Sequence, residues 1–142
     1  MASVIRATGG SLGYDRAHAE YFRIDATFFS YQRYPKGLTN FLWNLELAVE
    51  HENNAGEWRY EWVKLMHIGA GLRVVIGYDH PRGIPQRLQE AASLRRHSRY
   101  AVPGPMLLIL GPVTITRDSA FQAFEFGRFT PRQLTSQIHL HL

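Results

Sequence analysis

Residues 42–53, LWNLELAVEHEN, show the clearest alternation of apolar and polar side chains in the chain. A period of two predicts a β-strand whose two faces differ in character. One face would carry Trp43, Leu45, Leu47, Val49 and His51, and the other Asn44, Glu46, Ala48, Glu50 and Glu52. We expect the first face to be the core face, and the second to be polar and to end in acid.

Glu50 and Glu52 lie two residues apart on the predicted polar face, which separates them by about 7 Å. Two carboxylates at that distance repel each other and are costly to desolvate. A divalent cation between them would reverse that cost. The pair therefore indicates a metal site at the end of this strand.

A second alternating segment, residues 21–31, precedes the first. Its pattern puts Asp25 on the polar face of a predicted strand. Tyr34-Pro35-Lys36-Gly37 then reads as a turn, because proline presets one dihedral and glycine permits a positive φ. The two strands are expected to form an antiparallel hairpin that brings Asp25 towards Glu50.

The rest of the pattern predicts an α/β domain. Helical spacing of Trp58, Trp62, Leu65 and Met66 predicts a helix over residues 57–70, and the β-branched segment 72–78 predicts a strand after it, which favours a parallel crossover. The other expected elements are a loop over residues 1–13 with a short strand at 4–7, a helix capped by Asp15 and ending near Glu20, a helix over 84–98, a buried strand over 106–110, and one or two edge strands within 113–126.

This order of features resembles the PD-(D/E)XK nuclease superfamily, whose fold is that of many restriction endonucleases. The resemblance covers roughly residues 20–78 and implies a restriction endonuclease-like core, a mixed central sheet flanked by helices. It implies that Asp25 matches the motif's aspartate and Glu50 its first acid, both binding magnesium. Glu52 stands where the family's lysine is expected, and Lys64 lies on the following helix, where some members place that lysine.

The chemistry of the same residues can be argued from the side chains. Hydrolysis of a phosphodiester needs a neutralised phosphate and a hydroxide near pH 7, and Mg²⁺ or Mn²⁺ held by Asp25, Glu50 and Glu52 would supply both. Lys64 would hold the attacking water or stabilise the developing charge. Simpler interpretations also stand: Asp25 as a solvated strand residue, Glu52 as a turn cap, and Lys64 in an ion pair with a helix glutamate, Glu57 or Glu61.

Several weaker candidates remain. Glu20 could join the acidic site as an accessory, although a solvated helix end is the simpler interpretation. His51 lies on the face opposite the acids and is expected to pack under the sheet. Three further groups could have a function, although each is also explained by residues at the surface or at the chain end. Possible phosphate contacts are Arg87, Arg95, Arg96 and Arg99, and possible nucleic-acid contacts are Tyr31, Arg33 and Tyr34. The pair His139 and His141 could bind a metal.

Composition changes this picture only slightly. The 142 residues, 45% hydrophobic, are enough for one core and one domain over residues 1–142. Sixteen Lys and Arg against twelve Asp and Glu give a net charge of +4, which permits nucleic-acid binding without requiring it. The absence of cysteine excludes disulfides and thiolate chemistry. No membrane span or signal peptide is apparent, so a cytoplasmic location is expected.

Three classes of function follow from the sequence. The first is a Mg²⁺-dependent endonuclease acting on DNA, with RNA as the second choice of substrate. The second is a catalytically inactive nuclease-like module that binds nucleic acid, which is reasonable because the acid-x-lysine pattern is incomplete. The third is a structural subunit that works as a homodimer or within a larger assembly.

Overall fold

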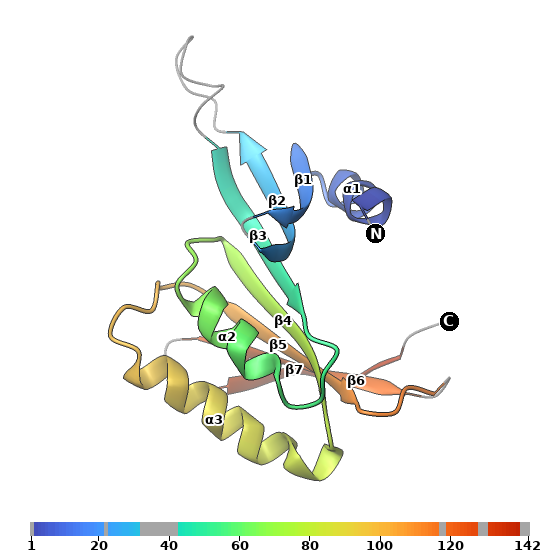
Figure 1. Cartoon of the computed structure of the whole chain (residues 1–142), viewed down its shortest axis with the longest axis vertical. Helices are drawn as coiled ribbons and strands as arrows, with labels where there is room; N and C mark the ends of the chain where they lie inside the picture. The colour runs from blue at the N-terminus through green and yellow to red at the C-terminus, as the bar shows by residue number, and fades with distance from the viewer. Residues whose placement is uncertain (1, 22, 32–42, 117–118, 128–130, 140–142) are drawn as a thin grey trace.

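The computed structural model describes residues 2–21, 23–31, 43–116, 119–127 and 131–139. In these ranges the chain forms an α/β fold with a seven-stranded mixed sheet (Figure 1). The elements in chain order are α1 (Ala2–Ser11), β1 (Arg16–Tyr21), β2 (Ile24–Tyr31), β3 (Trp43–His51), α2 (Trp58–Met66), β4 (Leu72–Asp79), the 3₁₀ turn η1 (Pro81–Gly83), α3 (Ile84–His97), β5 (Met106–Pro112), β6 (Ala120–Phe126) and β7 (Pro131–His139).

The strands lie side by side in the order in which they occur in the chain. Strands β1, β2 and β3 pair antiparallel, β3, β4 and β5 pair parallel, and β5, β6 and β7 pair antiparallel. The predicted pairing of the Asp25 strand with the Glu50 strand and the parallel crossover through α2 are therefore confirmed. The turn predicted at residues 34–37 lies outside the described residues.

Helices α2 and α3 cover one face of the sheet, whereas α1 lies beside β1 (Figure 1). The core between α2, α3 and the sheet is apolar: Trp58, Trp62 and Leu65 are completely buried. Gly77 of β4 allows this close packing, because a Cβ at that position would lie 2.6 Å from the Cβ of Trp58. The predicted tryptophan face of the helix is thus confirmed.

The N-terminal predictions were wrong. Residues 2–11 form α1 instead of a loop with a short strand, and residues 16–21 form β1 instead of a helix capped by Asp15. A Cβ on Gly9 would lie 2.8 Å from the Cβ of Ala17, so α1 packs against β1 at close range. Pairing of β1 with β2 and packing by α1 outweigh the local signals of glycine and of the aspartate cap.

The other end of the sheet also differs from the prediction. Residues 113–126 supply one strand, β6, and β6 is not an edge strand because β7 pairs along its other side. His139, expected in a frayed tail, is the last residue of β7, and His141 lies outside the described residues. Within the described residues, no helix is long and apolar enough to cross a membrane.

The two faces of β3 are buried in the opposite sense from the prediction. Ala48 and Glu50, on the face expected to be polar, are 0% and 2% exposed. Leu47 and Val49, on the expected core face, are only partly buried, and His51 is exposed. The reason is that α2 covers the face that carries Ala48, so the acid at the end of this face is enclosed by a helix.

Candidate functional site

Glu50 is the centre of a small charged cluster between β3 and α2. The Nζ atom of Lys64 lies 2.5 Å from Oε1 of Glu50 and 2.5 Å from Oε2 of Glu61. The same ammonium donates a hydrogen bond to the backbone carbonyl of Arg23 at 2.9 Å. One lysine therefore connects the end of β3, the helix surface and the start of β2.

The course of α2 explains why Lys64 reaches Glu50. The chain turns after β3, where the Glu57 N–H donates to the Asn54 carbonyl, and α2 then runs back over the sheet towards the start of β4. Lys64 and Glu61 are one turn apart on the same flank of α2. Because β4 is parallel to β3, the helix between them must return along the strands, which carries Lys64 back towards the acid.

Asp25 lies beside Glu50 at the start of β2. Its backbone N–H points to Oε2 of Glu50 at 3.4 Å, and its side-chain Oδ2 accepts the His51 N–H at 2.7 Å. These contacts follow from the antiparallel register, in which Ala26 lies opposite Val49. The structure thus brings Asp25, Glu50 and Lys64 together, although the sequence separates them by up to 39 positions, from 25 to 64.

Burial controls the protonation of this cluster. Burial raises the pKa of Glu50 from 4.5 to about 7, and the negative charges of Glu61 and Asp25 act in the same direction, while the hydrogen bond and charge of Lys64 oppose the rise. Burial alone would lower the pKa of Lys64, but its hydrogen bonds to Glu50 and Glu61 raise it overall, so the lysine is a cation at pH 7. The carboxyl groups of Glu50 and Glu61 contact one ammonium and that of Asp25 acts on Glu50, so the cluster carries an excess of negative charge.

The surroundings of Glu52 and Glu20 do not by themselves indicate metal ligands. Oε1 of Glu52 accepts the N–H of Asn54 at 2.7 Å, which agrees with the interpretation of Glu52 as a turn cap. Glu20 is exposed and has a positive φ of 52° at the end of β1. It follows a strand, not the helix that the sequence suggested.

Glu61 belongs to the cluster, although the sequence pattern indicates it only as a surface residue of the helix. The spacing predicts an ion pair of Glu61 with Lys64, which is present, and the Glu61 carboxylate also raises the pKa of the buried Glu50. The signal was present in the sequence, because an acid three residues before the lysine shares its helix flank. Glu57, the other partner considered, instead accepts a hydrogen bond from the Asn54 side chain.

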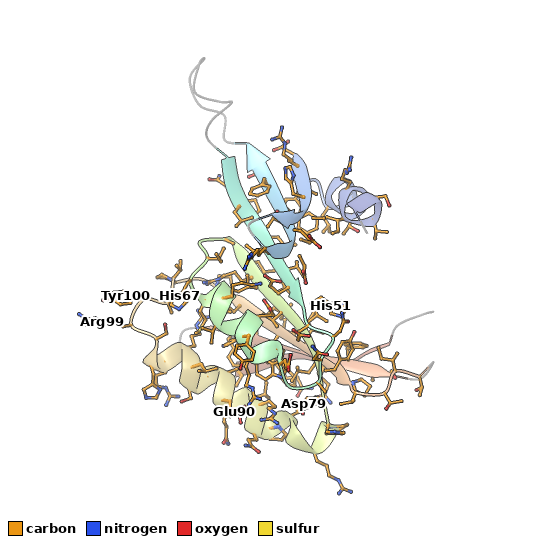
Figure 2. The ribbon with its side chains drawn as sticks, viewed as in Figure 1. His51, His67, Asp79, Glu90, Arg99 and Tyr100 are labelled. Atoms are coloured by element: carbon orange, nitrogen blue, oxygen red, sulfur yellow. The ribbon has the colours of Figure 1, made fainter. Side chains whose placement is uncertain are left out.

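A second buried ionic cluster at the far end of β4 has a structural role. Asp79 is 5% exposed, accepts the Nε–H of Arg87 at 2.8 Å and lies 3.5 Å from the indole nitrogen of Trp58. Arg87 also pairs with Glu90 at 3.0 Å, and Figure 2 shows Asp79 and Glu90 lying where α2 and α3 meet. Arg87, a candidate phosphate contact, is therefore occupied by two carboxylates.

His51 lies on the other face of the sheet, as expected, but it is exposed instead of packed. Its Nε2 is 2.8 Å from the hydroxyl of Tyr78, and the two rings are 5.7 Å apart. The ring projects away from α3 in Figure 2. The side chain of His51 therefore does not enter the cluster around Glu50, although its backbone N–H binds Asp25.

Comparison with known proteins adds no relative from which a site could be transferred. No protein-family model, no curated protein and no solved structure matches the chain. A function for this chain is therefore inferred from the cluster around Glu50.

Proposed function

We propose that this protein is a metal-dependent nuclease that hydrolyses phosphodiester bonds of DNA, with RNA as the second choice of substrate. The observation that carries the proposal is the contact between Lys64 and the buried Glu50, with Asp25 beside them. The sequence resemblance assigns the motif's aspartate to Asp25, its first acid to Glu50 and its displaced lysine to Lys64.

We further propose that β2, β3, α2 and β4 form the core of a restriction endonuclease-like domain of the PD-(D/E)XK superfamily. The support is topological. An antiparallel strand pair carries the two acids, and a helix and a parallel strand follow. Glu52 takes the place of the usual lysine, and Lys64 reaches the site from α2.

The residues at the site fit a hard divalent cation. Within the described ranges no group of three or more His, Cys, Asp or Glu side chains is arranged to hold a metal. Mg²⁺, however, commonly uses only one or two protein carboxylates, with waters and substrate phosphates completing its shell. Asp25 and Glu50 would be those ligands, and the excess negative charge around Glu50 favours an added cation. When bound, Mg²⁺ would neutralise phosphate charge and acidify a bound water.

The protein's own side chains would have distinct tasks. Burial and the contact with Lys64 hold the Glu50 carboxylate in one orientation, so it would be preorganised to bind a cation. Asp25 is oriented by the His51 N–H, which leaves its other oxygen for a ligand. Lys64 is 34% exposed and would hold the attacking water or stabilise negative charge on the phosphate.

One observation favours an inactive alternative. The Lys64 ammonium already contacts both Glu50 and Glu61, so it could serve as a permanent counter-ion in a nuclease-like module that binds nucleic acid or a protein partner. In that case the carboxylates would have no need of a metal. Metal binding therefore separates the two possibilities.

We expect Mn²⁺ or Mg²⁺ at millimolar concentration to raise the melting temperature of the protein by a few degrees, through binding to the folded state. Asp25→Asn should abolish this rise. Glu52→Gln and the helix-surface control Glu57→Gln should retain it, since those carboxylates contact Asn54. The measurement is a thermal melt with and without metal at constant ionic strength. An unchanged melting temperature in the parent protein would support the inactive module.

A further inference from the structure

A second, basic site lies at the C-terminal end of α3, where the chain passes through residues 98–105 into β5. It is a cavity of about 690 Å³, and its lining includes Arg95, Arg96, Ser98, Val102 and Gly104. Arg99 and Tyr100 lie at the same end of the molecule in Figure 2. No described acidic residue lines this cavity.

A buried arginine, Arg73, holds the loop of residues 102–104 that lines this cavity. Arg73 is 0% exposed, and its guanidinium donates to the carbonyls of Val102 at 2.9 Å, Pro103 at 3.2 Å and Gly104 at 2.8 Å. Arg95 donates to the same Gly104 carbonyl at 2.5 Å. Two cationic groups therefore converge on one loop.

The positive charge at this place is not balanced by acid. Within the part of the chain that the structure describes, neither Arg73 nor Arg95 forms an ion pair with a carboxylate, and Nε of Arg73 and Nη1 of Arg95 are buried without a hydrogen-bond partner. Burial lowers the pKa of both, and the charge of Arg95 helps to bring that of Arg73 to about 10. The carbonyl dipoles stabilise Arg73, but the formal charge remains uncompensated.

Arg96 adds a third charge to the wall of the cavity. It is exposed and lies next to Arg95 in the last turn of α3, where the helix dipole accounts for part of the preference for cations. The dipole does not account for a cavity lined by two arginines with a buried third one behind it. An anion in the cavity would supply the missing counter-charge.

We propose that this cavity binds a phosphate group. Guanidinium groups bind phosphate oxygens through paired, charge-assisted hydrogen bonds, and the hydroxyl of Ser98 offers a further donor. The phosphate could belong to a small phosphorylated molecule or to the backbone of a nucleic acid, which share this chemistry. The site does not depend on the proposed nuclease centre, because none of its residues belongs to the cluster around Glu50.

The test uses inorganic phosphate as the probe and the full-length protein. Phosphate should bind with a dissociation constant in the millimolar range, measured by calorimetry at fixed ionic strength with chloride as the reference anion. Arg96→Gln should weaken binding by about tenfold or more, as expected for one lost charge-assisted contact. Arg95→Gln should do the same. Arg82→Gln is the matched control, since Arg82 is an exposed arginine at the other end of α3.

Arg95 also holds the loop at Gly104, so its variant could lose stability; Arg96→Gln avoids that difficulty because Arg96 is exposed. Equal phosphate affinity in the parent and in Arg96→Gln would overturn the proposal, as would a parent protein that does not distinguish phosphate from chloride. A short single-stranded oligonucleotide then identifies the source. Competition of the oligonucleotide with inorganic phosphate assigns the site to nucleic-acid backbone. Displacement of the bound phosphate by a small phosphomonoester but not by the oligonucleotide assigns it to a small phosphorylated molecule.

Discussion

Replacing Lys64 by alanine is expected to lower Mg²⁺-dependent DNA cleavage by about a hundredfold or more, the effect typical of losing one preorganised charge-stabilising group. The ammonium lies 2.5 Å from Glu50, and in the proposed mechanism it would stabilise negative charge on a phosphate bound beside that carboxylate. Initial rates on a plasmid substrate, with parent and variant at the same Mg²⁺ concentration, measure the effect. Asp25 and Glu50 remain in the variant, so Mg²⁺ should still raise its melting temperature.

Lys36→Ala is the natural control, because Lys36 and Lys64 are the only lysines in the sequence. A parental cleavage rate for Lys64→Ala would remove Lys64 from the mechanism and leave any activity to the carboxylates. The stability of the variant is informative as well. Glu50 is 2% exposed, so loss of its cation should cost about 1–3 kcal/mol, the range for a buried polar group left without its partner and more than an exposed ion pair contributes.

Glu50→Gln is expected to flatten the dependence of stability on pH in metal-free buffer. The unfolded Glu50 ionises near 4.5, whereas burial raises its pKa in the folded protein to about 7. Between these values the folded state binds more protons than the unfolded state, so the parent loses stability as pH rises through this window. A shift of this size corresponds to about 3 kcal/mol. Glutamine cannot ionise and avoids that loss.

The measurement is the free energy of unfolding in urea at pH 4.5, 6 and 7.5, with a chelator present. The difference between variant and parent should grow in favour of Glu50→Gln by about 2–3 kcal/mol over this range. Taking differences cancels the titration of the seven histidines, which both proteins share. Glu57→Gln should follow the parent curve, since Glu57 is an exposed residue at the start of α2. A constant difference for Glu50→Gln would mean that the pKa of Glu50 is not raised in the folded protein.

The middle of the chain could be predicted from the sequence because its local pattern and its tertiary environment agree. The alternation in β3, the tryptophan spacing in α2 and the β-branched residues of β4 each specify one kind of element, and their order implies the parallel crossover. The same reasoning placed Asp25 near Glu50 and allowed Lys64 to reach it. Both contacts are present in the structure.

The ends of the chain could not be predicted, since their structure depends on partners distant in sequence. The α1 helix contains Gly9 and Gly10, which weaken a helix locally, and it is held by packing on β1. The prediction of which face of β3 is buried was wrong for a related reason. Alternation separates the two faces of a strand but does not say which face a helix will cover. Only the position of α2 shows that Glu50 is buried.

The arginines of α3 show the same limit of prediction from sequence. Arg87, Arg95 and Arg96 are equivalent in a sequence pattern, as charges on one helix. In the structure Arg87 is neutralised by Asp79 and Glu90, whereas Arg95 lies against a buried Arg73 and Arg96 lines a cavity. The sequence pattern does not indicate Arg73 as part of a site, because a single arginine in a β-branched strand gives no sign that its charge is buried.

DNA cleavage shows whether the cluster of Asp25, Glu50 and Lys64 is a metal-dependent nuclease centre. Supercoiled plasmid is incubated with the purified parent protein, with Asp25→Asn and with Glu50→Gln, each in Mg²⁺, in Mn²⁺ and in excess chelator. Under the nuclease proposal we expect the parent to nick or linearise the plasmid only with metal, and each variant to lose at least about a hundredfold in rate. Cleavage that persists at the parental rate in Glu50→Gln, or a parent protein that cuts neither DNA nor RNA in any metal, would contradict it.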